Sequence, residues 1–136
     1  MTGSARPGLS RWGYFWRRAL PAYWISLFCL THLPRLELQG VPGDDKTAHV
    51  LAYSVLALLL WQFFAARGRS LGDWFVVKVW GAVAAYAVFD EWTQQFVGRS
   101  PELGDWLADL AGATAVLAVL EWRRRATGRR GQTRPG

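Results

Sequence analysis

Residues 47–66, TAHVLAYSVLALLLWQFFAA, form an apolar run without proline, glycine or any lysine, arginine, aspartate or glutamate. A helix needs about 20 largely apolar residues to cross a hydrocarbon core of about 30 Å, and this run has that length. We therefore expect a membrane-spanning helix here.

Three more apolar segments lie on either side of this run, at about 19–33, 74–97 and 106–122. The segment 74–97 is also long enough to span, although it carries Lys78, Asp90 and Glu91. The segments at 19–33 and 106–122 are shorter, so they cross the membrane only if flanking side chains snorkel to the interface or the bilayer thins locally. Tryptophans near the segment ends are typical of a membrane interface: Trp12, Trp16, Trp74, Trp106 and Trp122. The sequence thus predicts an all-α polytopic membrane protein, a bundle of four transmembrane helices.

The composition agrees with a single membrane domain. Of the 136 residues, 51% are hydrophobic and nine are tryptophan, which is too apolar for a typical soluble domain of this length. The one cysteine, Cys29, excludes an intramolecular disulfide, and we expect it to be a packed or lipid-facing apolar side chain.

The placement of charge predicts the orientation. Most of the 16 basic residues fall in the two ends of the chain and in the loop after residue 66, which share one side of a four-span bundle. The positive-inside rule puts both termini in the cytoplasm. We expect a basic cytoplasmic tail at 1–18, a membrane domain at 19–122 and a disordered basic cytoplasmic tail at 123–136. The tails would contact anionic lipid head groups; nucleic acid is not an expected partner, because topology already accounts for the charge.

A cleavable signal peptide is the alternative for the start of the chain. The basic stretch RWGYFWRR at 11–18 precedes an apolar run, as in such peptides. The run ends in THLPRLE, however, with no small-x-small cleavage site.

Polar residues gather where three expected helices reach the outer side. Asp45, His49 and Tyr53 are spaced by four residues and share one helix face, beside Lys46. Each of these residues also has a purely structural role as the alternative to a role in a functional site. These roles are a helix cap for Asp45, snorkelling for Lys46, an inter-helix hydrogen bond for His49 and packing for Tyr53.

The second polar group follows in the third and fourth segments. Asp90 and Glu91 lie about 10 Å below the outer end of their helix, and Gln94 shares the face of Asp90. Arg99 lies in the next loop, and Asp105 and Asp109 share a face at the start of the fourth segment. Structural alternatives are pairing of the carboxylates with Arg99 or His49, and a cap for Asp105.

Histidine and carboxylates perform acid–base chemistry or bind a divalent metal, and cations bind phosphate. The expected catalytic residues are His49, Asp90, Glu91 and Asp109. The expected substrate-binding residues are Lys46, Tyr53, Gln94 and Arg99. Asp45, Asp105, Gly98 and Gly112 are expected to orient the site. The cofactor stays open; if there is one, it is a divalent metal, with His49, Asp90 and Glu91 as candidate ligands. No nucleophile elbow, P-loop or cysteine pair is present.

Two stretches resemble the VanZ-like family of small integral membrane proteins: DKTAHVLAY at 45–53 and DEWTQQFVGRSPELGDWLADLAG at 90–112. Two departures from its pattern are FVGR, where a proline often precedes the glycine, and Asp109, where asparagine is frequent. The resemblance implies a protein of the bacterial cell envelope. The founding member is associated with resistance to the glycopeptide teicoplanin, which is a phenotype and defines no reaction.

Together these features favour a multi-pass protein of the bacterial inner membrane whose polar site faces outward. An enzyme that hydrolyses a phosphorylated or anionic lipid is the favoured function. The alternative is a non-catalytic envelope protein that binds a lipid or a partner and alters glycopeptide susceptibility. Membrane lipids are the expected partners, and an oligomer is compatible with the sequence.

Overall fold

A computed structural model describes residues 11–33, 44–66, 72 and 74–132. These residues form four α-helices and one 3-10 turn, with no strand among them. The elements are α1 (Arg11–Thr31), α2 (Asp44–Ala65), α3 (Phe75–Gln94), η1 (Gln95–Val97) and α4 (Leu103–Gln132). The expected all-α fold is confirmed.

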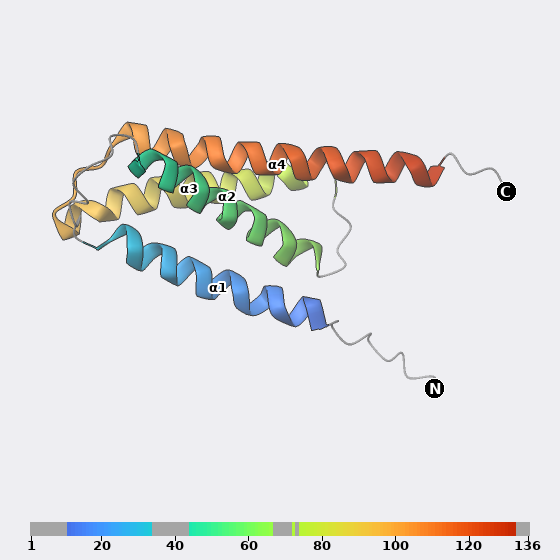
Figure 1. Cartoon of the computed structure of the whole chain (residues 1–136), viewed down its shortest axis with the longest axis horizontal. Helices are drawn as coiled ribbons and strands as arrows, with labels where there is room; N and C mark the ends of the chain where they lie inside the picture. Colours follow the sequence, from blue (N-terminus) through green and yellow to red (C-terminus); the bar gives the residue numbers. More distant parts are fainter. Residues whose placement is uncertain (1–10, 34–43, 67–71, 73, 133–136) are drawn as a thin grey trace.

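The helices run alternately up and down (Figure 1). The start of α1, the end of α2, the start of α3 and the end of α4 lie at one end of the bundle, on the right in Figure 1. We call this the basic end, because it carries Arg17, Arg18, Lys78 and Arg123–Arg125. We call the opposite end the acidic end; its carboxylates are Asp45, Asp90, Glu91, Glu102, Asp105 and Asp109.

An apolar core joins the four helices along their length. It is formed by Leu20 and Leu27 of α1, Leu56, Leu60 and Trp61 of α2, Val79 and Val83 of α3, and Leu117 of α4. Towards the basic end, the Trp61 ring meets the Phe75 ring edge to face, with 4.7 Å between ring centroids. Such burial and ring contacts stabilise the part of the bundle between the acidic end and the basic end.

The closest helix pair is α2 with α4, and Gly112 permits the approach. A side-chain carbon at Gly112 would collide with the backbone carbonyl of Val50 and the hydroxyl of Ser54. Small residues let helix backbones approach in this way. The contact sets α2 and α4 in register, so that the first turns of both helices face each other.

Two helices are longer than expected. Helix α1 starts at Arg11 rather than near residue 19, and it contains Pro21. Helix α4 continues to Gln132, through the stretch from residue 123 that was expected to be disordered. Arginine and alanine are good helix formers, and the Glu121 carboxylate pairs with Arg124 and Arg125 one turn on, at 2.7 and 2.6 Å.

Within the described residues, two helices are long and apolar enough to cross a membrane, at Asp45–Ala65 in α2 and Leu103–Thr127 in α4. The sequence had favoured the second and third segments. Helix α3 differs because its 20 residues include Lys78, Asp90 and Glu91. Helix α4 qualifies because it starts earlier and ends later than its apolar run.

Candidate functional site

Buried polar side chains from three helices meet at the acidic end. Each is less than a tenth exposed: His49 of α2; Asp90, Glu91 and Gln94 of α3; Asp105 and Asp109 of α4. We call this group the acidic cluster. Its composition is unusual, because charged side chains are almost never fully buried without partners. Their partners therefore indicate what each of them can do.

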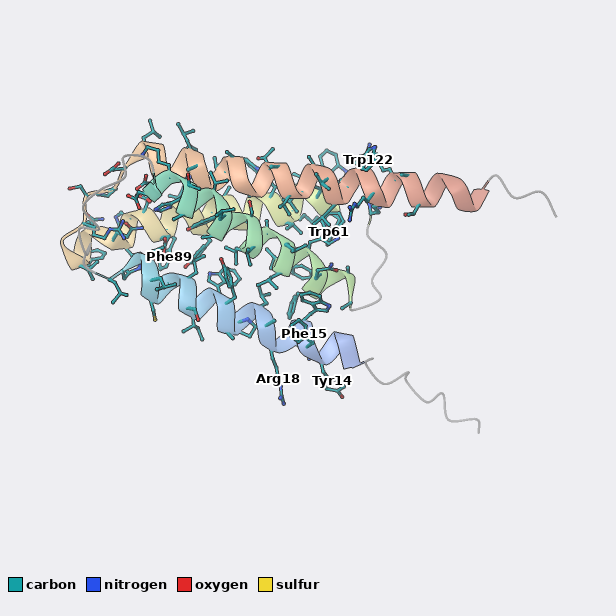
Figure 2. The ribbon with its side chains drawn as sticks, viewed as in Figure 1. Tyr14, Phe15, Arg18, Trp61, Phe89 and Trp122 are labelled. Atoms are coloured by element: carbon teal, nitrogen blue, oxygen red, sulfur yellow. The ribbon has the colours of Figure 1, made fainter. Side chains whose placement is uncertain are left out.

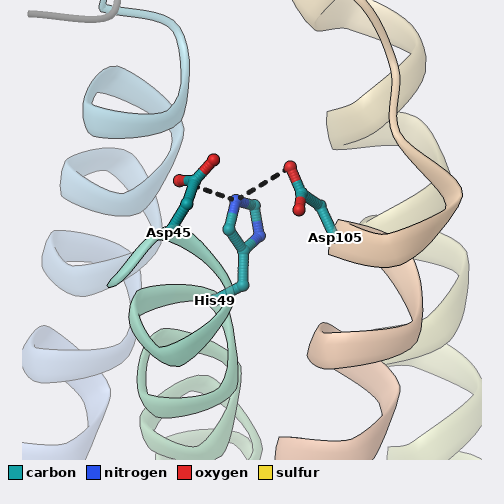
Figure 3. A group of neighbouring side chains, drawn as sticks. All are labelled: Asp45, His49 and Asp105. Atoms are coloured by element: carbon teal, nitrogen blue, oxygen red, sulfur yellow. Dashed lines mark ion pairs between the residues drawn. The ribbon is translucent and has the colours of Figure 1, made fainter. Parts of the chain in front are cut away.

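His49 lies between carboxylates on both sides of its ring. Its Nδ1 is 2.9 Å from Asp109 Oδ1. Its Nε2 is 3.7 Å from Asp105 Oδ2 and 4.0 Å from Asp45 Oδ1, as the dashed lines in Figure 3 show. A ring protonated on Nδ1 donates to Asp109 and turns the Nε2 lone pair towards Asp45 and Asp105. This is the geometry of a histidine oriented by a carboxylate.

Asp90 is fully buried, and donors surround its carboxylate. Oδ1 accepts hydrogen bonds from the hydroxyls of Thr31, at 2.9 Å, and Tyr86, at 3.3 Å. Oδ2 accepts hydrogen bonds from the Tyr53 hydroxyl and the Gln94 amide, both at 3.3 Å. The donors come from α1, α2 and α3, so the Asp90 carboxylate ties three helices together.

Glu91 and Asp109 each have one buried oxygen that is not hydrogen-bonded. Glu91 Oε2 accepts the backbone N–H of Glu102 at 3.0 Å, whereas Oε1 has no partner in the described chain. Asp109 Oδ1 contacts His49, whereas Oδ2 has no partner there. Leaving a buried acceptor unsatisfied is costly, and more so for a charged one.

The two cations of the predicted site have different surroundings. Lys46 is half exposed, and its Nζ lies 3.0 Å from Asp105 Oδ1 and 3.7 Å from Glu102 Oε2. Arg99 Nη1 donates to the Thr31 carbonyl at 2.5 Å, which joins the loop before α4 to the last turn of α1. Both arrangements hold the cation at the outer edge of the acidic cluster.

Two predicted orienting features have a geometric basis. Gly98 adopts φ of 77°, a left-handed conformation that favours glycine, and it ends η1. Asp45 and Asp105 do not precede their helices as caps; they lie within the first turns of α2 and α4. A carboxylate there is still favourable, because the helix N-terminus carries partial positive charge.

A cavity of about 200 Å³ opens beside His49, between α1 and α2. Its polar lining is Thr31, Asp45, His49, Tyr53 and Arg99, and its apolar lining is Leu27, Leu30, Ala48 and Ala52. Asp90, Glu91 and Asp109 do not line it. Its volume is below the roughly 300 Å³ of the smallest drug-sized pockets, which suits a small head group rather than a whole lipid.

Sequence reasoning missed four polar residues of this region. Tyr86 lies four residues before Asp90, a spacing that would have placed it on the same face. Thr93 Oγ1 lies 2.9 Å from His32 Nε2, and the His32 ring Nδ1 is 3.8 Å from Asp90. Thr31 is the last residue of α1 and His32 follows it, and no spacing within the sequence shows that this end of α1 packs beside Asp90.

Comparison with known proteins gives no counterpart: the chain matches no family model, no curated protein sequence and no solved structure. The resemblance to the VanZ-like family therefore stays a prediction.

Proposed function

We propose that the chain crosses the bacterial inner membrane four times. Two helices qualify as spans on length and composition, and only 33% of each of these spans is buried inside the protein. Large apolar side chains are also exposed on α1 and α3, including Ile25, Leu30, Val88 and Phe89. In Figure 2, Tyr14 and Arg18 of α1 and Trp122 of α4 point outward at a similar level along the bundle. A soluble monomer rarely exposes so much contiguous apolar surface.

The proposed orientation puts the basic end in the cytoplasm. Arg17, Arg18 and Arg123–Arg125 lie at that end with Lys78, and the positive-inside rule assigns such ends to the cytoplasmic side. Both helix ends next to the chain termini, the start of α1 and the end of α4, are on this side (Figure 1). The acidic cluster then opens outward.

The proposed activity is hydrolysis of a phosphorylated or otherwise anionic lipid at the outer leaflet. The observation that supports it most is the buried His49–Asp109 pair, 2.9 Å apart, whose histidine also lines a cavity with Arg99. Apolar residues on the other wall of that cavity, Leu27 and Leu30, suit the adjoining lipid chain. An arginine is well matched to phosphate oxygens.

In this proposal His49 accepts a proton from the attacking water as the water oxygen bonds to phosphorus, and Asp109 keeps the ring in the orientation that this requires. The bond from phosphorus to the lipid oxygen breaks, and His49 returns the proton to that oxygen as the lipid alcohol leaves. Arg99 binds the phosphate oxygens at the cavity. Lys46 and Asp105 form an ion pair beside His49 and are not part of the cavity lining. Asp90 holds α1, α2 and α3 in place rather than reacting, because four donors already occupy its oxygens.

The family assignment is proposed with the function. The residues that carry the VanZ-like pattern, among them His49, Glu91 and Asp109, come together at one end of the bundle, which supports a common role for them. The second candidate is a protein that binds an anionic lipid without turnover. The cavity lining favours it, since Arg99 lines the cavity and can bind an anionic head group, whereas Glu91 and Asp109 do not line it.

Phosphate release decides between the two. Purified protein in nanodiscs is incubated with a panel of lipid phosphates, and inorganic phosphate is measured. We expect His49→Ala to lower the release about 100-fold or more, because a general base contributes about that much. Glu121→Gln is the matched control: it alters a buried carboxylate at the basic end and should leave the release unchanged. Lipid binding without release by the folded wild type would favour the second candidate.

A further inference from the structure

We infer that His49, Glu91 and Asp109 bind a divalent metal cation within the acidic cluster. One ring nitrogen of His49 and one carboxylate oxygen each from Glu91 and Asp109 lie within 4.8 Å of one another. All three residues are at least nine-tenths buried, and they come from α2, α3 and α4. Cation binding does not require that the protein be a hydrolase.

Two buried carboxylate oxygens without hydrogen-bond partners support a bound cation. Glu91 Oε1 and Asp109 Oδ2 are buried, and neither has a hydrogen-bond partner in the described chain. Buried polar atoms are nearly always satisfied, so two such oxygens in one group call for an explanation. A cation bound between the helices would give these carboxylates the partner that they lack.

The spacing of the donor atoms suits a common ion. Ligand atoms at about 2.1 Å from one ion lie roughly 3 to 4 Å from each other. The His49 Nδ1 and Asp109 Oδ1 atoms are hydrogen-bonded at 2.9 Å, and an ion bound by both atoms would replace the proton between them. The remaining separations, up to 4.8 Å, close by small side-chain rotations.

The local charge also favours a cation. Among the described residues, neither Glu91 nor Asp109 pairs with a lysine or arginine. Lys46 pairs instead with Asp105 and Glu102, nearer the surface. A divalent ion would neutralise the two buried carboxylates, whose mutual repulsion otherwise opposes the packing of α3 against α4.

The donor set selects the class of metal. Imidazole suits zinc and other transition metals, whereas carboxylates alone suit magnesium and calcium. One nitrogen and two oxygens therefore fit Zn²⁺ or Mn²⁺ better than Ca²⁺. Three protein ligands leave room for water, so a bound ion would itself supply the activated water for the proposed hydrolysis, and that part rests on the proposed function. His49 would then hold the ion, and it would accept the proton of the attacking water only in the metal-free protein.

Asp90 is not a ligand of this site, although the sequence had favoured it. Its two oxygens each accept two hydrogen bonds, from hydroxyls and an amide that a metal would have to displace. Asp109, which the sequence analysis expected among the catalytic residues, takes its place as a ligand.

The test is Mn²⁺ binding by the full chain. Protein in nanodiscs is stripped with EDTA and titrated with Mn²⁺, and free Mn²⁺ is counted by electron paramagnetic resonance. We expect one Mn²⁺ per chain, displaced by Zn²⁺. Asp109→Asn and Glu91→Gln should each weaken binding at least about tenfold, because even residues that only support a ligand contribute that much. Glu121→Gln, a buried carboxylate at the other end of α4, should bind as the wild type does.

Circular dichroism and size-exclusion chromatography establish that each variant is folded. A folded wild type that binds no Mn²⁺ or Zn²⁺ at millimolar concentration overturns the site, whatever the variants do. The site is also overturned if Asp45→Asn and Asp105→Asn abolish binding while Glu91→Gln keeps it, because the ion then lies on the outer side of His49. Phosphate release is measured separately. Phosphate release that continues in EDTA contradicts only the role of the cation in hydrolysis. Mn²⁺ binding without phosphate release contradicts only the proposed hydrolysis.

Discussion

At the scale of single residues, Asp90 and Glu91 are neighbours in the chain with opposite surroundings. Asp90 accepts four hydrogen bonds from three helices, whereas Glu91 accepts one backbone N–H and keeps one buried oxygen unpaired. A carboxylate whose oxygens are all occupied stabilises packing. One with a free oxygen is available to a ligand. The two residues should therefore respond differently to substitution.

Asp90→Ala should lower the stability of the folded protein. It leaves the hydroxyls of Tyr53 and Tyr86 without their acceptor, and each orphaned buried donor costs about 1–3 kcal/mol. Thermal unfolding in nanodiscs measures the effect. Asp45→Ala is the control, since its half-exposed side chain should cost under about 1 kcal/mol. Equal unfolding temperatures for the two variants would contradict the anchoring role.

Spacing along a helix predicted part of this residue-level picture. The four-residue steps placed Asp45, His49 and Tyr53 on one helix face; His49 and Tyr53 are buried, whereas Asp45 is half exposed. The partner of Asp90 on α1 could not be predicted, because Thr31 is 59 positions away in the sequence and only the packing of α1 brings it close. The different surroundings of Asp90 and Glu91 could not be predicted for the same reason.

At the scale of elements, the contact of α2 with α4 positions His49 opposite Asp105 and Asp109. Gly112 is the point of closest approach, since a side chain there meets the backbone of Val50. Backbone atoms cannot rotate away as a side chain can, so an added methyl group must separate the helices. Such overpacking typically costs about 1–3 kcal/mol.

Gly112→Ala should therefore destabilise the protein and lengthen the distance between His49 and Asp109, which weakens Mn²⁺ binding as well. Gly81→Ala is a matched control on α3, where the added carbon meets nothing within 4 Å. That change should be neutral or stabilise by up to about 1 kcal/mol, because alanine is the better helix former. Chemical denaturation of both variants checks the sign of each effect, and a neutral Gly112→Ala would be the contrary result.

Helix bounds were predictable where apolar residues marked them. The runs at 47–66 and 74–97 agree with α2 and with α3 plus η1 to within a few residues. The start of α1 and the end of α4 were missed because arginine-rich stretches were interpreted as tails. Arginine is compatible with a helix, and the Glu121 ion pairs span one helical turn.

At the scale of the whole molecule, the alternating helices separate two kinds of charge. The sequence predicted this separation from loop composition alone, because a four-span count places successive loops on opposite sides. The contacts between helices were not predictable in that way. Neither the extensive packing of α2 on α4 nor the position of α1 follows from a hydropathy pattern.

Labelling of single cysteines tests the topology. Cys29 is replaced by serine, and a cysteine is placed at exposed Ser100 near the acidic end or at exposed Thr127 near the basic end. In intact spheroplasts, a membrane-impermeant maleimide should label Ser100→Cys and label Thr127→Cys only after lysis. The reverse pattern would place the acidic cluster in the cytoplasm, and labelling of both sites without lysis would contradict the four-span bundle.

The separation of charge also gives the bundle a response to voltage. With arginines at one end and carboxylates at the other, the protein is an electric dipole along the membrane normal in the proposed orientation (Figure 1). A resting potential that is negative inside acts on each charge that crosses the full field with about 2.3 kcal/mol per 100 mV. The field therefore holds the basic end inward after insertion. The same field draws external cations inward, towards the buried carboxylates, so an energised membrane would give this end of the protein a higher cation occupancy than a depolarised one.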